Sequence, residues 1–169
     1  LAINADLAAS FYYSQQYDRS ENQLENLLEL NPSFIRARVI LGKVWEQKGQ
    51  HAKAIEMLRS ALALSGNDPV TLSALAHALA IARKTGAANK ILGELHELAN
   101  QVYVSAGNFA AIYTGLGKID LAFSWLEKAF ENKDIEIVWL KVSPIFDPLR
   151  VDSRFSELIG RVSPVLLPS

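Results

Sequence analysis

Apolar residues recur with helical spacing along most of the chain, in blocks separated by short polar turns. Leu41 and Trp45 lie four residues apart, and a second block places Leu24, Leu27 and Leu28 in an i, i+3, i+4 pattern. Such spacings gather apolar side chains on one face of a helix. No stretch of useful length alternates apolar and polar residues as a half-buried strand does. The pattern therefore predicts an all-α protein.

The blocks repeat every 34 residues, and six columns of similar residues keep this spacing over four units. Agreement this regular does not arise by chance. We predict four units, residues 1–34, 35–68, 69–102 and 103–136, followed by a C-terminal segment of residues 137–169. The columns are Leu7, Leu41, Leu75 and Phe109; Ala8, Gly42, Ala76 and Ala110; Phe11, Trp45, Leu79 and Tyr113; Ser20, Ala54, Ala88 and Ala122; Leu24, Leu58, Leu92 and Leu126; and Leu27, Ala61, Leu95 and Ala129.

Two of the columns contain only small residues, for a steric reason. Gly, Ala or Ser lets the backbones of two crossing helices approach closely, while larger residues nearby fill the grooves beside the crossing. Asn31-Pro32 and Asn67-Asp68-Pro69 separate successive units, and Asp68 is a suitable N-cap residue. The pattern of each unit therefore predicts two antiparallel helices. These helices bury their apolar faces by stacking on neighbouring units. In the third unit we expect the second helix to continue through Gln101.

The second unit reads Leu41-Gly42-x2-Trp45, Gly49, Ala54-x3-Leu58 and Ala61, and the fourth reads Phe109-Ala110-x2-Tyr113, Gly117, Ala122-x3-Leu126 and Ala129. Both resemble the tetratricopeptide repeat, and the resemblance covers residues 1 to about 136. It implies a right-handed α-solenoid of antiparallel helix pairs. The chain departs from the repeat's pattern at Arg38, and at Gln15 and Arg83, which stand where the glycine between the two helices is expected.

The C-terminal segment carries a narrower resemblance. Trp139-Leu-Lys-Val-Ser-Pro-x-Phe-Asp-Pro-Leu-Arg150 and Asp152-Ser-Arg-Phe155 resemble the end of bacterial chains in which tetratricopeptide arrays follow winged-helix, adenylate cyclase or protein kinase domains. The resemblance implies a sensor or partner-binding part of a larger bacterial regulator. The first residue, Leu1, is not methionine, which fits a piece of a longer chain or a processed one.

We expect this segment to cap the solenoid, because a terminal repeat needs a polar outer face. Residues 134–141 are expected to form a short helix, with N-caps at Asp147-Pro148 and Asp152-Ser153. A last helix is expected over roughly residues 153–161. Its inward residues would be Phe155, Leu158 and Ile159, and its outward residues Arg154, Glu157 and Arg161.

The charge balance narrows the range of partners. Seventeen basic and eighteen acidic residues give a net charge of −1, without the basic excess that gathers nucleic-acid phosphates or anionic lipid. No apolar run is long enough to span a membrane, and no signal peptide is recognisable. The chain has no cysteine, which excludes disulfides and thiolate chemistry. We therefore predict a cytoplasmic protein that binds neither nucleic acid nor membranes.

Fragments that imitate catalytic motifs do not fit their chemistry. His96-Glu97-Leu98-Ala99-Asn100 has asparagine where the zinc-protease helix requires a second histidine. Gly115-Leu116-Gly117-Lys118 lacks the spacing, the Ser or Thr, and the preceding strand of a phosphate-binding loop. Ser105 lacks the flanking glycines of a nucleophile elbow. We predict no catalytic residues, no metal and no cofactor.

A binding surface is the remaining candidate for function. In the resembled family, the first helix of each pair lines a concave groove, and aromatic, Arg and Lys side chains on such a wall are suited to holding a peptide. The resemblance therefore implies a module that binds a protein or peptide. The candidate ligand-binding residues are Tyr12, Tyr13, Arg36, Lys43, Glu46, Gln47, Ser73, His77 and Thr114.

One subclass of the family grips acidic peptide C-termini with Lys, Asn and Arg side chains. Here Ala5 and Ala9 stand at the first-unit positions, and Val70 and Ala74 at the third-unit positions, so that clamp is absent. The alanine-lined first unit leaves room for an upstream segment, a second copy of the chain or an apolar ligand. The alternative function is a structural or self-association module that sets the oligomeric state of an attached effector domain, with a homodimer as its expected product.

Overall fold

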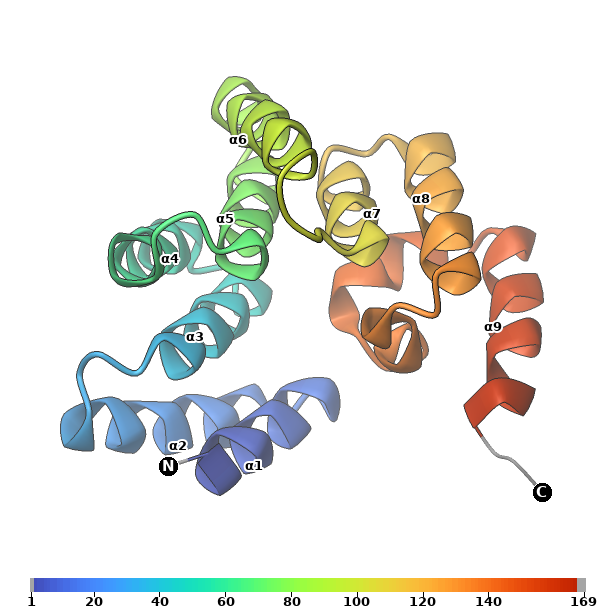
Figure 1. The fold of residues 1–169 in the computed structure, drawn as a ribbon. Coiled ribbons are helices and arrows are strands. Elements are labelled where there is room, and N and C mark those ends of the chain that lie inside the picture. Colours follow the sequence, from blue (N-terminus) through green and yellow to red (C-terminus); the bar gives the residue numbers. More distant parts are fainter. Residues whose placement is uncertain (1, 167–169) are drawn as a thin grey trace.

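The computed structural model describes residues 2–166 of the 169-residue chain (Figure 1). Residues 2–166 contain helices and connecting turns but no strand, so the predicted all-α solenoid with C-terminal capping helices is confirmed. The division into units at residues 34, 68, 102 and 136 stays a prediction. The helices are α1 (Ala2–Tyr13), α2 (Tyr17–Leu30), α3 (Ile35–Gln47), α4 (His51–Ser65), α5 (Pro69–Ile81), α6 (Thr85–Leu98), α7 (Ala106–Gly115), α8 (Ile119–Glu131), the 3₁₀ helices η1 (Ile135–Trp139) and η2 (Pro144–Leu149), and α9 (Ser153–Leu166).

The small-residue columns lie at the closest approach of the two helices in each pair. All eight of these residues are buried. In the first pair the Ser20 hydroxyl donates a hydrogen bond to the Ala8 carbonyl, 2.8 Å away. In the second pair, a Cβ added at Gly42 would lie only 2.6 Å from Cγ of Leu58. The backbones are therefore too close to accept larger side chains at these positions.

The turns inside the four pairs share one backbone conformation. Gln15, Gly49, Arg83 and Gly117 all have positive φ angles, of 59°, 73°, 59° and 69°. They are 34 residues apart, so the turn keeps its left-handed residue even where the sequence has no glycine. The departures at Gln15 and Arg83 therefore leave the turn geometry unchanged.

The fourth pair joins the stack differently from the second and third. In the second and third pairs, the first helix packs against the second helix of the preceding pair: α3 packs on α2, and α5 packs on α4. In contrast, of the two helices in the preceding pair, α7 packs mainly against α5 and has little contact with α6. The third and fourth pairs are thus joined through their first helices.

Small residues make this close packing possible. Every residue of α5 from Thr71 to Ala80 is buried, as are seven consecutive residues of α7 from Ala106 to Ile112. A Cβ added at Gly115, at the end of α7, would lie 2.9 Å from Cδ2 of His77 on α5. A helix that is apolar nearly all round is one that neighbours enclose. Here α7 covers the side of α5 that would otherwise face the concave surface.

Three expectations about local structure are corrected. Helix α6 ends at Leu98 rather than at Gln101, and turns and extended residues lead from it to α7, whose N-cap is Ser105. Asp147 and Pro148 lie inside η2 and do not cap a helix. Helix α9 continues to Leu166, past the expected end near residue 161. By contrast, Asp68 caps α5 as expected, accepting a 2.8 Å hydrogen bond from the backbone N–H of Thr71.

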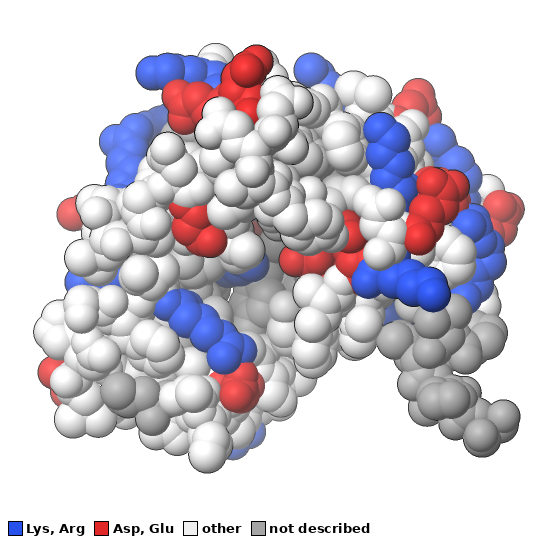
Figure 2. Space-filling view, viewed as in Figure 1, with Lys and Arg blue, Asp and Glu red and all other residues white. Residues whose placement is uncertain are grey.

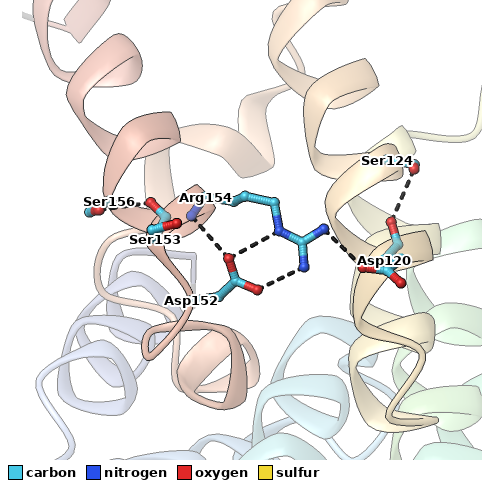
Figure 3. A network of polar contacts seen from close by, with 6 residues as sticks. All are labelled: Asp120, Ser124, Asp152, Ser153, Arg154 and Ser156. Carbon is cyan, nitrogen blue, oxygen red and sulfur yellow. Dashed lines mark hydrogen bonds and ion pairs between the residues drawn. The ribbon is translucent and has the colours of Figure 1, made fainter.

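The C-terminal segment covers the fourth pair. Helix α9 packs against α8, and η2 against α7. Arg154 links these elements: its guanidinium lies 4.3 Å from the ring centre of Phe123 and donates hydrogen bonds to Asp152 and Asp120 (Figure 3). The hydrogen bond from Arg154 lowers the pKa of Asp152. Phe155 and Leu158 are buried and Ile159 is partly buried, whereas Arg154, Glu157 and Arg161 are exposed, as the sequence predicts.

The start of this segment is fixed to the N-terminus of α7. Buried Asp134 accepts hydrogen bonds from the hydroxyl groups of Tyr103 and Ser105, the latter at 2.8 Å. Ser105 also lies 2.7 Å from a carboxylate oxygen of Glu136, in η1. A carboxylate at a helix N-terminus is favourably placed with respect to the helix dipole. These contacts direct η1 towards the concave side.

The crossing in the second pair yields a stability prediction. Ala54 is fully buried on α4, so Ala54→Leu is expected to overpack the core and cost roughly 1–3 kcal/mol. Ala52 is exposed on the same helix, and Ala52→Leu serves as the matched control. Urea denaturation followed by circular dichroism measures both variants. Equal stability of the two would contradict the close crossing.

The contact between α5 and α7 yields a second prediction. In Gly115→Ala, the new methyl group would meet the His77 ring at 2.9 Å and Ala80 at 3.2 Å, so we expect a loss of roughly 1–3 kcal/mol. A Cβ at Gly93, inside α6, would meet nothing within 4 Å, and Gly93→Ala should gain up to ~1 kcal/mol through helix propensity. Denaturant unfolding of both proteins checks the opposite signs. A Gly115→Ala protein as stable as the parent would rule out the contact.

Candidate binding groove

An open groove of about 1420 Å³ lies on the concave side of the first two helix pairs. Helices α1 and α3 and the start of α5 form most of its wall, and the C-terminal segment contributes Trp139 and Val142. Figure 2 shows a hollow between the N-terminal helices and the C-terminal segment, with mostly uncharged walls. Leu64 and Val70 add exposed apolar surface to its rim. The groove is therefore mainly apolar.

A stacked pair of aromatic rings joins the two sides of this concave space. The rings of Tyr13, at the end of α1, and Trp139, at the end of η1, lie 4.7 Å apart between centroids, with an interplanar angle of 5°. These residues are 126 positions apart, so the stack links the first helix to the C-terminal segment. The stack borders both the open groove and a smaller inner cavity of about 70 Å³.

The predicted site residues divide into three groups in the structure. Tyr13, Arg36 and Lys43 line the open groove. Gln47 does not line it, and its side-chain amide donates a 3.3 Å hydrogen bond to Glu46. The remaining five are buried: Tyr12, Glu46, Ser73, His77 and Thr114.

Helix α7 explains the burial of the third- and fourth-unit candidates. The Ser73 hydroxyl donates a 3.1 Å hydrogen bond to the Asn108 carbonyl of α7. Thr114 bonds within α7, its hydroxyl 2.8 Å from the Ala110 carbonyl. His77 faces the end of α7, as the contact with Gly115 requires. Ser73 and His77 therefore connect α5 to α7 and also line the inner cavity of about 70 Å³, and a ligand-binding role for these residues and Thr114 stays a prediction.

Glu46 and His77 form a buried polar pair between α3 and α5. His77 Nδ1 lies 2.9 Å from Glu46 Oε2, and both side chains are less than 5% exposed. His77 Nε2 is also buried and has no hydrogen-bond partner among the described residues. The hydroxyl of Tyr12 likewise has none, and burial raises the pKa of Tyr12, with a smaller contribution from Glu46.

The two cations of the groove differ in their surroundings. Arg36 forms an ion pair with Asp6 across the groove wall, from α3 to α1. Lys43 has no ion-pair or hydrogen-bond partner among the described residues, although it is partly buried. Burial lowers the pKa of Lys43, while the negative charges of Glu46 and Glu136 act in the opposite direction. Lys43 is therefore a partly desolvated cation without a direct counter-ion.

Sequence reasoning missed the contribution of the C-terminal segment to the groove. Trp139 was placed in a solvent-facing cap, yet it closes one side of the concave space. One signal for the burial of Ser73 and His77 was present, since α5 and α7 carry small or apolar residues on nearly all faces. No group of three or more His, Asp or Glu side chains among the described residues could hold a metal ion. No helix in that part of the chain is long and apolar enough to cross a membrane.

Comparison with known proteins finds a family match in the first part of the chain. Residues 5–69 match the family model described as a tetratricopeptide repeat. No curated protein matches the sequence. Tetratricopeptide-like repeats of a putative kinesin light chain from Podosopora anserina are similar in structure, with a TM-score of 0.56 and 16% identity over 98% of this chain and 94% of that one.

Two further solved structures share the fold. The MamA protein has a TM-score of 0.53 and 20% identity, covering 95% of this chain and 88% of that one. YrrB, described as a TPR protein with an unusual peptide-binding site, has a TM-score of 0.52 and 16% identity over 96% of this chain and 84% of its own. The family match covers residues 5–69, and the solved structures share the fold over most of the chain. They support a protein–protein interaction module.

The aromatic stack yields a coupling prediction. Replacing Tyr13 and Trp139 by leucine, singly and together, should give a coupling of ~0.5–1.5 kcal/mol in unfolding free energy, because the rings interact beyond their buried area. Phe11 lies under Arg19 instead, so the pair Phe11→Leu and Trp139→Leu serves as the control and should be additive. Thermal and urea unfolding of the variants measure both cycles. Additive effects at Tyr13 and Trp139 would show that the rings do not stack in solution.

Proposed function

We propose that the groove between α1, α3 and the C-terminal segment binds a segment of a partner protein. The observation that carries this proposal is the open, mainly apolar cavity of about 1420 Å³ on the concave side. Pockets for small molecules measure roughly 300–1000 Å³, so this one suits a longer ligand. Its lining combines apolar and aromatic side chains with few charges, which favours a peptide with apolar anchors.

The arrangement of the walls also supports a polypeptide ligand. Helices α1 and α3 supply parallel rows of side chains, from Asp6 to Ser14 and from Ile35 to Lys43. A segment lying along these rows could place successive anchors against them. A cytoplasmic location, and a role as the C-terminal part of a larger bacterial regulator, are part of this proposal and rest on the sequence alone.

One observation favours self-association as a second candidate function. Leu7 on α1 is 45% exposed, whereas its equivalents Leu41, Leu75 and Phe109 are at most 3% exposed. A preceding helix pair packs near each of those equivalents, and none of the described residues covers Leu7 in this way. Ile3, one turn earlier, is 82% exposed. A second copy of the chain could cover this edge and form a homodimer.

Selection from a peptide library tests the primary proposal. A display library of random dodecapeptides, joined to its carrier through the peptide C-terminus, should yield binders to the chain. Val70→Glu introduces a charge at an exposed position of the groove wall and should weaken the selected peptides at least about tenfold. Val151→Glu is the matched control, since Val151 is 95% exposed and lies outside the groove.

Two outcomes would overturn the groove assignment: an absence of binders both in this library and among dodecapeptides with a free C-terminus, or binders that Val70→Glu and Val151→Glu affect equally. Sedimentation at micromolar concentration separates the second candidate. If the chain dimerises through the α1 edge, Leu7→Glu should return it to a monomer while the Val70→Glu protein stays dimeric.

A further inference from the structure

We infer that the groove selects a segment bearing an acidic side chain, and that Lys43 is the residue that receives this carboxylate. The inference rests on the proposed function, since it names the chemistry of the segment bound in the same groove. It separates Lys43 from Arg36, which lies seven residues earlier on the same helix.

The argument begins with the different state of the two cations. Arg36 is half exposed and already paired with Asp6, so its charge is compensated in the free protein. Lys43 lies on the same wall, about two turns further along α3. Its ammonium group lies within 4.0 Å of no carboxylate oxygen among the described residues. Of these two cations, only Lys43 lacks a counter-ion in the free protein.

The two carboxylates that act on Lys43 through space have other contacts in the structure. Glu46 is held by His77 at 2.9 Å and receives a hydrogen bond from Gln47. Glu136 lies 2.7 Å from the Ser105 hydroxyl, beside the N-terminus of α7. Both act on Lys43 through space without forming an ion pair with it. Neither carboxylate lies within 4.0 Å of the Lys43 ammonium group.

Burial makes this lysine sensitive to an incoming anion. The surrounding protein disfavours the charged form and lowers the pKa of Lys43. A carboxylate that enters the groove replaces part of the lost hydration with a charge-assisted hydrogen bond. An uncharged segment would cover Lys43 without such compensation, which is costly. The groove therefore discriminates against segments with no acidic group at this point.

The geometry favours an acidic side chain over a chain-terminal carboxylate. Lys43 is the last residue of α3 on the groove wall, but the facing wall of α1 continues to Tyr13 and Ser14. A segment that follows α1 therefore passes the ammonium group and does not end at it. Ile40, Val70 and Trp139 also border the groove, so the residues flanking the acidic one are expected to be apolar.

A double-mutant cycle between protein and peptide tests the inference. Peptides selected from the C-terminally joined dodecapeptide library should carry Asp or Glu at one fixed position between apolar residues. Lys43→Met keeps much of the side-chain length and should weaken these peptides at least about tenfold. The same peptides with Gln or Asn at the fixed position should bind Lys43→Met at least as tightly as the parent protein, because the variant has no charge to leave uncompensated. Lys90→Met, on the exposed face of α6, is the control cation and should leave affinity unchanged.

The outcomes distinguish failure of the inference about Lys43 from failure of the proposed groove function. Binders that show no acidic preference and are insensitive to Lys43→Met overturn the role of Lys43, while groove binding stands. If the C-terminally joined library yields no binders but dodecapeptides with a free C-terminus bind, the choice of a side-chain carboxylate is overturned. An absence of binders in both formats removes the proposed function itself. Circular dichroism and thermal unfolding show whether Lys43→Met is folded, and Lys43→Gln provides a second neutral variant.

Discussion

The contact between α5 and α7 determines what the concave side of this solenoid can do. Small residues on both helices let them pack closely, with Gly115 against the ring of His77. As a result, the first helices of the third and fourth pairs face one another, and the inner part of the concave side shrinks to a cavity of about 70 Å³. Interiors packed this closely resist added volume. The open groove is thereby confined to the first two pairs, the start of α5 and the C-terminal segment that faces them.

Side chains at concave repeat positions would be expected to have similar roles. The confinement of the groove gives them different roles. Glu46 and His77 occupy concave positions, yet they form a buried pair that joins α3 to α5. Lys43, three residues before Glu46, lines the open groove and has no such partner. Polar groups enclosed between helices form hydrogen bonds with one another, whereas polar groups that line the groove are available to a ligand. The distribution of paired and unpaired charges therefore distinguishes structural positions from candidate binding positions more sharply than repeat position does.

The sequence was sufficient for the helix pairs because their determinants are local and recur every 34 residues. The columns containing Ala54 and Leu58, and the N-cap at Asp68, could be predicted from periodicity and capping preferences alone. The stack of Tyr13 on Trp139 could not, since it depends on how four pairs and a non-repeating segment curve in space. Similarly, the 34-residue spacing shows which residues of α7 correspond to those of α5, but it does not say which helix α7 will pack against.

The most direct test of this arrangement is an NMR measurement on the ligand-free protein. The chain has three histidines, so the His77 ring protons can be assigned in a simple region of the spectrum. Close packing of α5 and α7 predicts strong nuclear Overhauser effects between the Hδ2 proton of His77 and the Hα protons of Gly115. Absence of these effects, together with exchange of the His77 environment to that of a solvent-exposed imidazole, would contradict the closure of the inner concave side.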